Sequence, residues 1–391
     1  MDAKLVRILD YYTEKFGGEL IPKLAALETQ GWHVVKEFEQ LQTIKEDPKF
    51  HGDVTSFVHS LQVVNILQRI YGFIYLQEQH RKINVVALEQ ALSLLPTSLQ
   101  DHLEKTIGNH KRQELLFFAC IFHDIGKIKH FSHLMKDVEK ENVKGITRFI
   151  FHADYGWYYF DDEMDELEKQ MNDFEQKLQK EQNPIKQQFY QHALEYLHEL
   201  KNEFEARRTF FEQLQITSAE RKYLAFVIKN HMDLLNLYNQ FLQAYKAREQ
   251  KDGEKLLDSL TKNILKKVEE YGEQYLDCIL LNFCDLLESA HSAKHPTEEL
   301  YVFFHLCMLC FAKKDELASG GKIVFEENQW KVITKPKPAY TFSALFKTYP
   351  KDKALAIKNI VTENPSNPSE ALKKAGYGPY EVEKILTLLK S

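Results

Sequence analysis

The stretch LLFFACIFHDIGKIKHF, residues 115–131, joins a strongly apolar run to an abrupt polar end at His123 and Asp124. The apolar run predicts a buried helix. An imidazole and a carboxylate at the end of such a helix can reach one cation, and these two ligand types suit a divalent metal. Gly126 lets the chain turn, and Lys127 follows where its ammonium can meet a phosphate oxygen. The alternative is a helix end with a capping histidine and a surface aspartate.

Helical periodicity dominates the rest of the chain. Apolar residues recur three and four positions apart almost everywhere, as at Leu5, Ile8 and Leu9, which indicates amphipathic helices. The exception is GKIVFEENQWKVI, residues 321–333, whose alternating pattern predicts a small β-hairpin with a turn at residues 327–328. We therefore expect a mainly α protein.

Changes in composition divide the chain into three expected parts. Residues 1–50 are an N-terminal helical extension, and residues 51–318 form the principal helical domain. Within that domain, residues 161–184 consist mostly of acidic residues, Gln and Lys, which predicts a solvated helical insertion. Residues 319–391 contain the hairpin, a stiff Pro336–Pro338 linker and a small basic helical unit.

The charge of the chain limits its partners. The formal net charge is −6 over 391 residues, which argues against a surface built wholly to cover nucleic acid or anionic lipid. Residues 331–391 nevertheless carry 11 Lys and 5 acidic residues. Lysines interleaved with aromatic residues can hold a nucleic-acid backbone, so nucleic-acid contact through this C-terminal unit is one hypothesis. A solvated lysine-rich face is the alternative.

Cysteine usage and hydropathy indicate a cytoplasmic protein. The five cysteines are sparse, odd in number and each embedded in an apolar stretch, which predicts reduced core thiols. No segment approaches the roughly 18 uncharged residues that a membrane span requires. We therefore expect neither a secretory signal nor a membrane segment.

Four further segments carry side chains that suit the same cation site. His59 opens a helix in HGDVTSFVHSLQVVNIL, His152 begins HADYGWYYF, and His231 ends the apolar run of YLAFVIKNH. Asp285 is the only charged residue between Cys278 and Leu287. Burying a lone carboxylate costs several kcal/mol, so it should be paired or bound to metal.

The order of these residues resembles the HD-domain superfamily of metal-dependent phosphohydrolases, over about residues 51–292. The phrases GDV, HSLQVV, FHDIGK, IKNH and ILLNFCDLLES are most similar to the HD domains of bacterial tRNA nucleotidyltransferases. No Gly-Ser plus paired-Asp signature occurs before residue 50, so the polymerising activity of those proteins is not implied.

The resemblance implies an HD-type helical core and one or two divalent metal ions per chain, with Mn, Fe, Mg, Ni and Co all suited to the ligands. The implied ligands of the first metal are His59, His123, Asp124 and Asp285. His152 and His231 match positions that hold a second metal in some members and contact phosphate in others. Metal-bound water would attack phosphorus while Lys127 neutralises the nonbridging oxygens, and a neutral histidine would protonate the leaving oxygen.

The expected activity is hydrolysis of a phosphate ester in a nucleotide or nucleic acid. The alternative is a regulatory protein that senses a nucleotide and engages a macromolecular partner through its C-terminal unit; a structural scaffold without metal is a third possibility. His59 and His123 lie 64 residues apart, which predicts inserted helices near residues 80–112. Five other histidines lie in polar sequence and are expected at the surface, namely His51, His130, His133, His291 and His295.

Overall fold

The computed structural model is mainly α-helical, with two small two-stranded antiparallel sheets, which confirms the expected fold class. The residues that it describes are 3–29, 40–46, 51–52, 54–79, 82–128, 152–153, 156, 160, 164–248, 250, 252–326, 329–333, 342–364 and 367–390. In this part of the chain, no helix combines the length and apolar character that crossing a bilayer requires.

The chain divides into two compact units. The first consists of Met1–Lys314 with Glu327–Trp330, and the second of Asp315–Glu326 with Lys331–Ser391. The predicted hairpin is present as strands β3 (Lys322–Glu326) and β4 (Gln329–Ile333), and its expected turn lies outside the described residues. The three-part division with limits at 50 and 318 stays a prediction.

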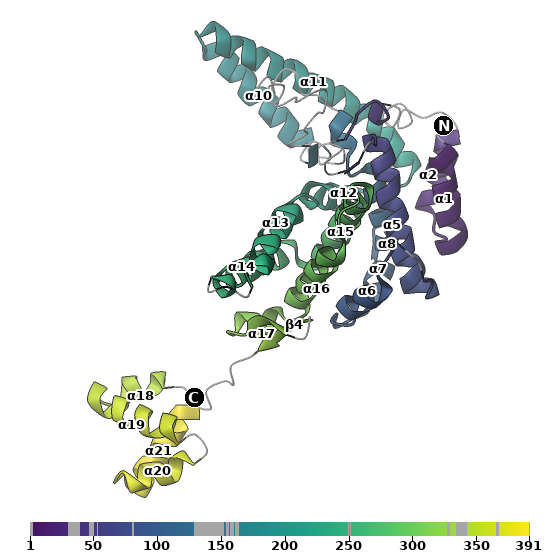
Figure 1. Cartoon of the computed structure of the whole chain (residues 1–391). Coiled ribbons are helices and arrows are strands. Elements are labelled where there is room, and N and C mark those ends of the chain that lie inside the picture. The colour runs from purple at the N-terminus through teal and green to yellow at the C-terminus, as the bar shows by residue number, and fades with distance from the viewer. Residues whose placement is uncertain are drawn as a thin grey trace. The chain divides into compact units, whose positions relative to one another are not determined.

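Four helices form the centre of the first unit and pack against one another: α5 (Ser56–Leu76), α8 (Arg112–Phe122), α12 (Ser218–Asn230) and α15 (Tyr275–Ser292) (Figure 1). Every residue of α8 is buried. The apolar run therefore forms the buried helix that its sequence predicts, because it has packing partners on all sides.

Two further helices, α1 (Ala3–Phe16) and α2 (Leu20–Thr29), pack on this centre. The ring of Tyr12 lies 4.1 Å from that of Phe117, and the buried Glu114 accepts a hydrogen bond from the backbone N–H of Leu20 at 2.9 Å. That carboxylate satisfies an N–H group that the first turn of α2 leaves free.

An ion pair between Arg112 and Asp277 joins α8 to α15 away from their C-terminal ends. The Arg112 Nη1 atom donates to Asp277 Oδ2 at 2.6 Å, and His102 Nε2 lies 3.1 Å from Asp277 Oδ1. All three side chains are buried. This contact helps to fix the two helices that carry His123 and Asp285.

Residues 82–112 contain the helices α6 (Val85–Leu92) and α7 (Leu99–Glu104). They also contain an unpredicted hairpin of strands β1 (Thr106–Ile107) and β2 (His110–Lys111). Gly108 adopts φ +65° in its turn, and a Cβ there would lie 2.4 Å from Thr217 Oγ1. Glycine therefore allows the turn to approach the start of α12.

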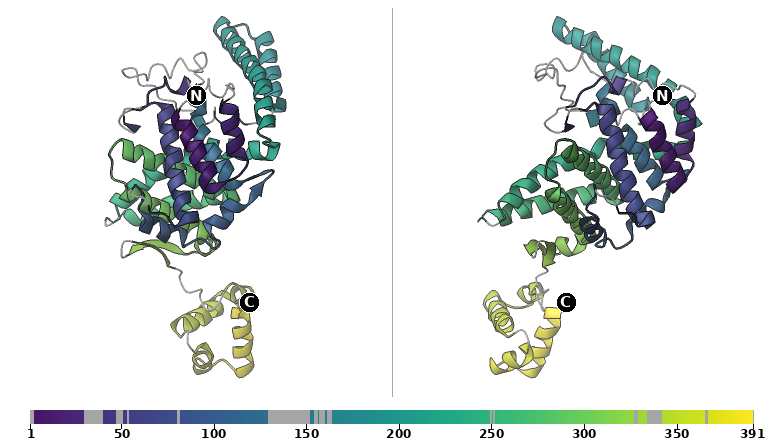
Figure 2. Two further views of the ribbon diagram at one scale, coloured as in Figure 1. Left: turned by 90° about the vertical axis from the view of Figure 1, so that its right-hand side faces the viewer. Right: turned by 45° about the vertical axis from the view of Figure 1, so that its right-hand side comes forward.

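The acidic segment is helical over residues 164–180, as expected, and residues 181–183 connect this helix to the next one. Helix α10 (Met164–Lys180) lies along α11 (Pro184–Gln213) as a helical hairpin (Figure 2). Their contact is a small apolar cluster of Met171, Leu194 and Leu197. Residues 161–163 lie outside the described residues.

The remaining elements of the first unit include α13 (Asp233–Lys246), α14 (Gly253–Tyr271), α16 (Glu298–Ala312) and the short helices η1 (Ile125–Ile128) and η3 (Gly272–Gln274). Helix α17 (Lys314–Ala318) lies at the division between the units. All five cysteines are free and buried, which confirms that they are core thiols.

The C-terminal unit has its own apolar core. Its helices are α18 (Ser343–Thr348), α19 (Lys351–Glu363), α20 (Pro368–Lys374) and α21 (Pro379–Lys390). Their core is the set Leu345, Ala354, Ile357, Val361, Leu372, Val382, Ile385 and Leu389. Around this core, the exposed lysines of the helices are Lys347, Lys351, Lys358, Lys373, Lys374 and Lys384.

Candidate metal centre

The centre begins where α8 ends. His123 is the C-cap residue of α8, and its Nδ1 lies 2.8 Å from the carbonyl oxygen of Cys120. Because a carbonyl oxygen only accepts, Nδ1 carries the hydrogen and Nε2 keeps a lone pair. Free carbonyls occur in the last turn of any helix. The position of His123 at the end of α8 therefore selects the tautomer that a metal requires.

His231 repeats this arrangement at the end of α12. It is the C-cap residue of α12, and its Nδ1 donates to the carbonyl oxygen of Ile228 at 2.5 Å. Burial, together with the nearby His152 and His123, lowers the pKa of His231 to about 3. His231 is therefore neutral and presents an Nε2 lone pair.

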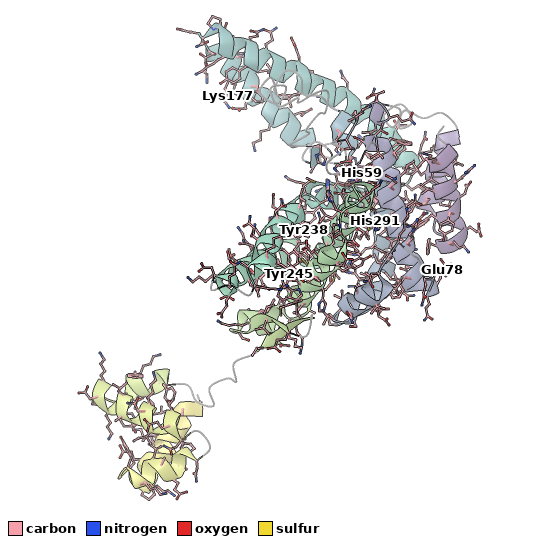
Figure 3. The ribbon with its side chains drawn as sticks, in the orientation of Figure 1. His59, Glu78, Lys177, Tyr238, Tyr245 and His291 are labelled. Carbon is pink, nitrogen blue, oxygen red and sulfur yellow. The ribbon has the colours of Figure 1, made fainter. Side chains whose placement is uncertain are left out.

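His59 lies in the first turns of α5, near its N-terminal end (Figure 3). The Nε2 atom of His59 lies 2.9 Å from Asp285 Oδ1 and 3.7 Å from Asp124 Oδ2. Its Nδ1 contacts Glu288 Oε2 at 2.5 Å. Burial alone would lower the pKa of His59, but Asp285 and Glu288 hold it well above its usual value. The surroundings of this imidazole thus favour a cation.

Asp124 stands between the other side chains. Its Oδ2 lies 3.4 Å from His123 Nε2, and its Oδ1 lies 3.3 Å from His152 Nε2. The Nε2 atoms of His152 and His231 are 3.4 Å apart. Asp124 therefore belongs to two groups of three side chains that could each surround an ion. The first group is His59, His123 and Asp124, and the second is Asp124, His152 and His231.

The close approach of His152 to α12 depends on Gly156. A Cβ at Gly156 would lie 2.7 Å from Ile228 Cγ2 and 3.6 Å from the carbonyl oxygen of His123. Gly156 follows His152 by four residues in the sequence. The absence of a side chain there allows His152 to approach the ends of α8 and α12 together.

The charges of the centre also fit a cation. Four carboxylates of the centre are buried: Glu46 and Asp124 contact the ammonium of Lys127, whereas Asp285 and Glu288 contact His59. Burial would raise the pKa of Asp124, but His123, Lys127 and His152 hold it well below its usual range. The pKa of Asp285 is likewise lowered, against burial, by its contact with His59. The centre therefore contains more carboxylates than lysines, a balance that suits a divalent cation.

One buried nitrogen provides a separate test of whether the residues fit a metal. His123 Nε2 makes no hydrogen bond to any described residue, although it is buried and carries a lone pair. Buried polar atoms are rarely left without a partner. An ion between His123, His59 and Asp124 would supply that partner, so the side chains present fit the metal implied by the sequence.

The structure brings together all six predicted ligands and also shows the position of Lys127. The Lys127 ammonium lies 2.7 Å from Glu46 Oε1 and 2.9 Å from Asp124 Oδ2. Burial would lower its pKa, but the two carboxylates raise it. Lys127 is therefore a buried cation that holds Asp124, and its contact with phosphate stays a prediction.

Three residues near the centre were missed by the sequence analysis: Glu46, Glu288 and His51. Glu288 follows Asp285 by three residues, so the spacing that puts both on one face of α15 was a usable signal. Glu46 reaches the site because the backbone of Lys45 pairs with that of Thr55, which no local pattern indicates.

The prediction that His51 lies at the surface is wrong. His51 is only partly exposed, its ring lies 4.5 Å from that of His59, and its Nδ1 lies 2.9 Å from Ser289 Oγ. His295 is exposed as expected and His291 is partly buried, whereas His130 and His133 lie outside the described residues.

Comparisons with known proteins do not assign this chain to a family. No family model matches the sequence, and the search of curated proteins finds no matching relative. The case for a metal centre therefore rests on the residues and their geometry.

Proposed function

We propose that this protein is a metal-dependent phosphohydrolase of the HD type that acts on a phosphate ester of a nucleotide or nucleic acid. The observation that supports it most strongly is Asp124, whose two carboxylate oxygens face two different groups of histidines. A carboxylate in this position suits two cations side by side. Divalent ions there would polarise a phosphoryl oxygen and lower the pKa of water.

The first metal would be held by His59, His123, Asp124 and Asp285. The second would be held by Asp124, His152 and His231. Two features of His231 favour a ligand over a general acid: its Nδ1 hydrogen is already donated to the Ile228 carbonyl, and its pKa is about 3. Its Nε2 can accept but has no proton to give near neutral pH. We therefore assign His231 to the second metal.

Lys127 takes a supporting role in this proposal. Its ammonium lies between Glu46 and Asp124, where it orients the Asp124 carboxylate and offsets part of the negative charge. Direct contact with a phosphate oxygen would require the ammonium to leave a buried carboxylate, which is costly. The positive charge that meets the substrate is therefore assigned to the metal ions.

Activity against a panel of esters tests the proposal. Monoesters and diesters of p-nitrophenol, nucleoside monophosphates and cyclic nucleotides are each incubated with the protein and with Mn, Fe, Mg, Ni or Co. We expect phosphate or nitrophenol release that Asp124→Asn abolishes. The matched control Asp352→Asn removes an exposed carboxylate of α19 and should leave the rate unchanged.

The alternative function is that of a regulatory protein that binds a nucleotide without hydrolysing it. Nucleotides would then raise the melting temperature by binding the folded state, with no phosphate released under any metal. Because the two outcomes differ in a product, a single panel that records both melting temperature and phosphate distinguishes them.

We also propose that the C-terminal unit contacts nucleic acid. Six lysines of its helices are exposed: Lys347, Lys351, Lys358, Lys373, Lys374 and Lys384. Fluorescence anisotropy with labelled single- and double-stranded DNA and RNA should show binding that weakens as salt rises. The double variant Lys373→Gln, Lys384→Gln should bind more weakly than wild type. The control Lys262→Gln, which replaces an exposed lysine of α14, should bind as tightly as wild type. Equal binding by all three proteins would contradict this proposal.

A further inference from the structure

We infer that Glu288 is a positioning residue that holds His59 in the tautomer and orientation needed to bind the first metal. The Glu288 Oε2 atom contacts His59 Nδ1 at 2.5 Å, and both side chains are buried. A carboxylate accepts this bond, so Nδ1 carries the hydrogen and Nε2 is directed at Asp124 and Asp285. This inference rests on the metal centre proposed above.

His59 needs such a partner because of its place in its helix. His123 and His231 end their helices, where the carbonyls of Cys120 and Ile228 accept the Nδ1 hydrogen. His59 lies at the start of α5, where the free backbone groups are N–H donors and not acceptors. An acceptor for His59 must therefore come from another helix, and α15 supplies it in Glu288.

Glu288 is itself held in place. Ser292, one turn later in α15, donates its hydroxyl to Glu288 Oε1, so both carboxylate oxygens have partners. Gly52 packs against the backbone of Ser292, since a Cβ at Gly52 would lie 2.7 Å from the Ser292 carbonyl oxygen. With one oxygen on His59 and the other on Ser292, Glu288 is placed as the outer partner of a ligating histidine.

The geometry also argues against a third metal site at Glu288. His51, His59 and Glu288 lie close enough to form a metal-binding group. The direct contact between His59 Nδ1 and Glu288 Oε2, however, fills the position that an ion would take, and His51 Nδ1 is engaged by Ser289. We therefore assign the group to positioning.

Cobalt binding tests this inference without depending on activity. Co²⁺ is titrated into metal-free wild type, Glu288→Ala and Glu288→Gln while its visible absorption is recorded. Loss of an outer partner of a ligating histidine costs about 10- to 100-fold in metal affinity, and we expect that loss in Glu288→Ala. The amide oxygen of Glu288→Gln can still accept the Nδ1 hydrogen, so this variant should keep most of the affinity. In wild type labelled with ¹⁵N at its histidines, His59 should show a protonated Nδ1, and Glu288→Ala should change this signal.

The matched control is Glu220→Gln. Glu220 is also buried and accepts a hydrogen bond from a histidine, His110, at 2.9 Å, but it lies outside the metal centre. Its cobalt affinity should equal that of wild type. If Glu288→Ala does not fold, Glu288→Leu, which fills much of the same space but accepts no hydrogen bond, gives the answer alone.

The outcomes separate this inference from the proposed function. Wild-type cobalt affinity and an unchanged His59 signal in Glu288→Ala would overturn the positioning role and leave the metal centre intact. Weaker cobalt binding by Glu288→Ala in a protein that hydrolyses no ester would support the positioning role and contradict the enzyme. A wild-type protein that binds no cobalt would overturn both.

Discussion

The carboxylate of Asp124 lies 2.9 Å from the ammonium of Lys127, three residues later in the chain, and both groups are buried. The same ammonium lies 2.7 Å from Glu46. One lysine thus holds a predicted metal ligand and a carboxylate from a distant segment. The candidate metal centre is consequently part of the core, and changes in its charges should alter folding as well as any metal binding.

Lys127→Met should destabilise the protein by about 3–5 kcal/mol, because it leaves two buried carboxylates without their cation. Urea unfolding of metal-free protein measures this loss. The double variant Lys127→Met, Glu46→Gln removes one of the two charges and should recover part of the stability. An equal stability of wild type and Lys127→Met would show that this ion pair is not formed in solution.

His152→Ala and His231→Ala should each reduce the metal content from two ions per chain to one. Both histidines face only the second group, whereas His59 and His123 face the first. Elemental analysis after dialysis measures the ratio, and circular dichroism confirms that the variants remain folded. Retention of two ions by both variants would assign these histidines to phosphate contact instead.

Asp285→Asn should weaken binding of the first metal ion and leave binding of the second unchanged. Asp285 lies 2.9 Å from His59 and belongs to a helix that the second group does not use. Replacing the carboxylate by an amide removes one negative charge from the ligand set. Two successive binding steps in a calorimetric titration should become one, and an unaltered titration would exclude Asp285 as a ligand.

The stability of the fold should depend on pH through Glu220. Its carboxylate accepts hydrogen bonds from Asn109, His110 and Thr217. Burial would raise the pKa of Glu220, but these bonds favour the ionised form more strongly, so the pKa lies below its usual value of 4.5. A lowered pKa in the folded state contributes stability that is present above pH 4.5 and lost as the pH falls through the folded-state value.

Glu220→Gln should therefore cost about 2 kcal/mol near neutral pH, where hydrogen bonds to a charged group are lost. The difference from wild type should shrink as the pH falls below 4.5, because the wild-type carboxyl is then also neutral. Urea midpoints measured across the acid range test this, and a difference independent of pH would contradict the ionised state of Glu220.

Much of the fold and of the centre follows from sequence. The apolar run before His123 predicts the buried α8, and the ordered His and Asp residues lie together as the sequence implies. The β1–β2 hairpin could not be predicted because two residues per strand show no alternation, and its turn depends on Gly108 packing against Thr217. Local composition cannot reveal such tertiary contacts.

The partners of the ligands were less predictable than the ligands. Glu46 lies in a polar stretch that reads as surface, and it is buried only because Lys127 and Ser56 bond to it from other segments. His51 is drawn inward by Ser289 of α15 in the same way. When the partner of a buried charged residue lies in a distant segment, the sequence around that residue does not indicate its burial.

The most direct test of the central claim is the metal-to-protein ratio of freshly purified protein, with the His123→Ala, Asp124→Ala double variant measured beside it. We predict two divalent ions per wild-type chain and none in the double variant, since Asp124 serves both groups. A wild-type protein that holds no metal, even after incubation with Mn, Ni or Mg, would contradict the metal centre and the enzyme with it.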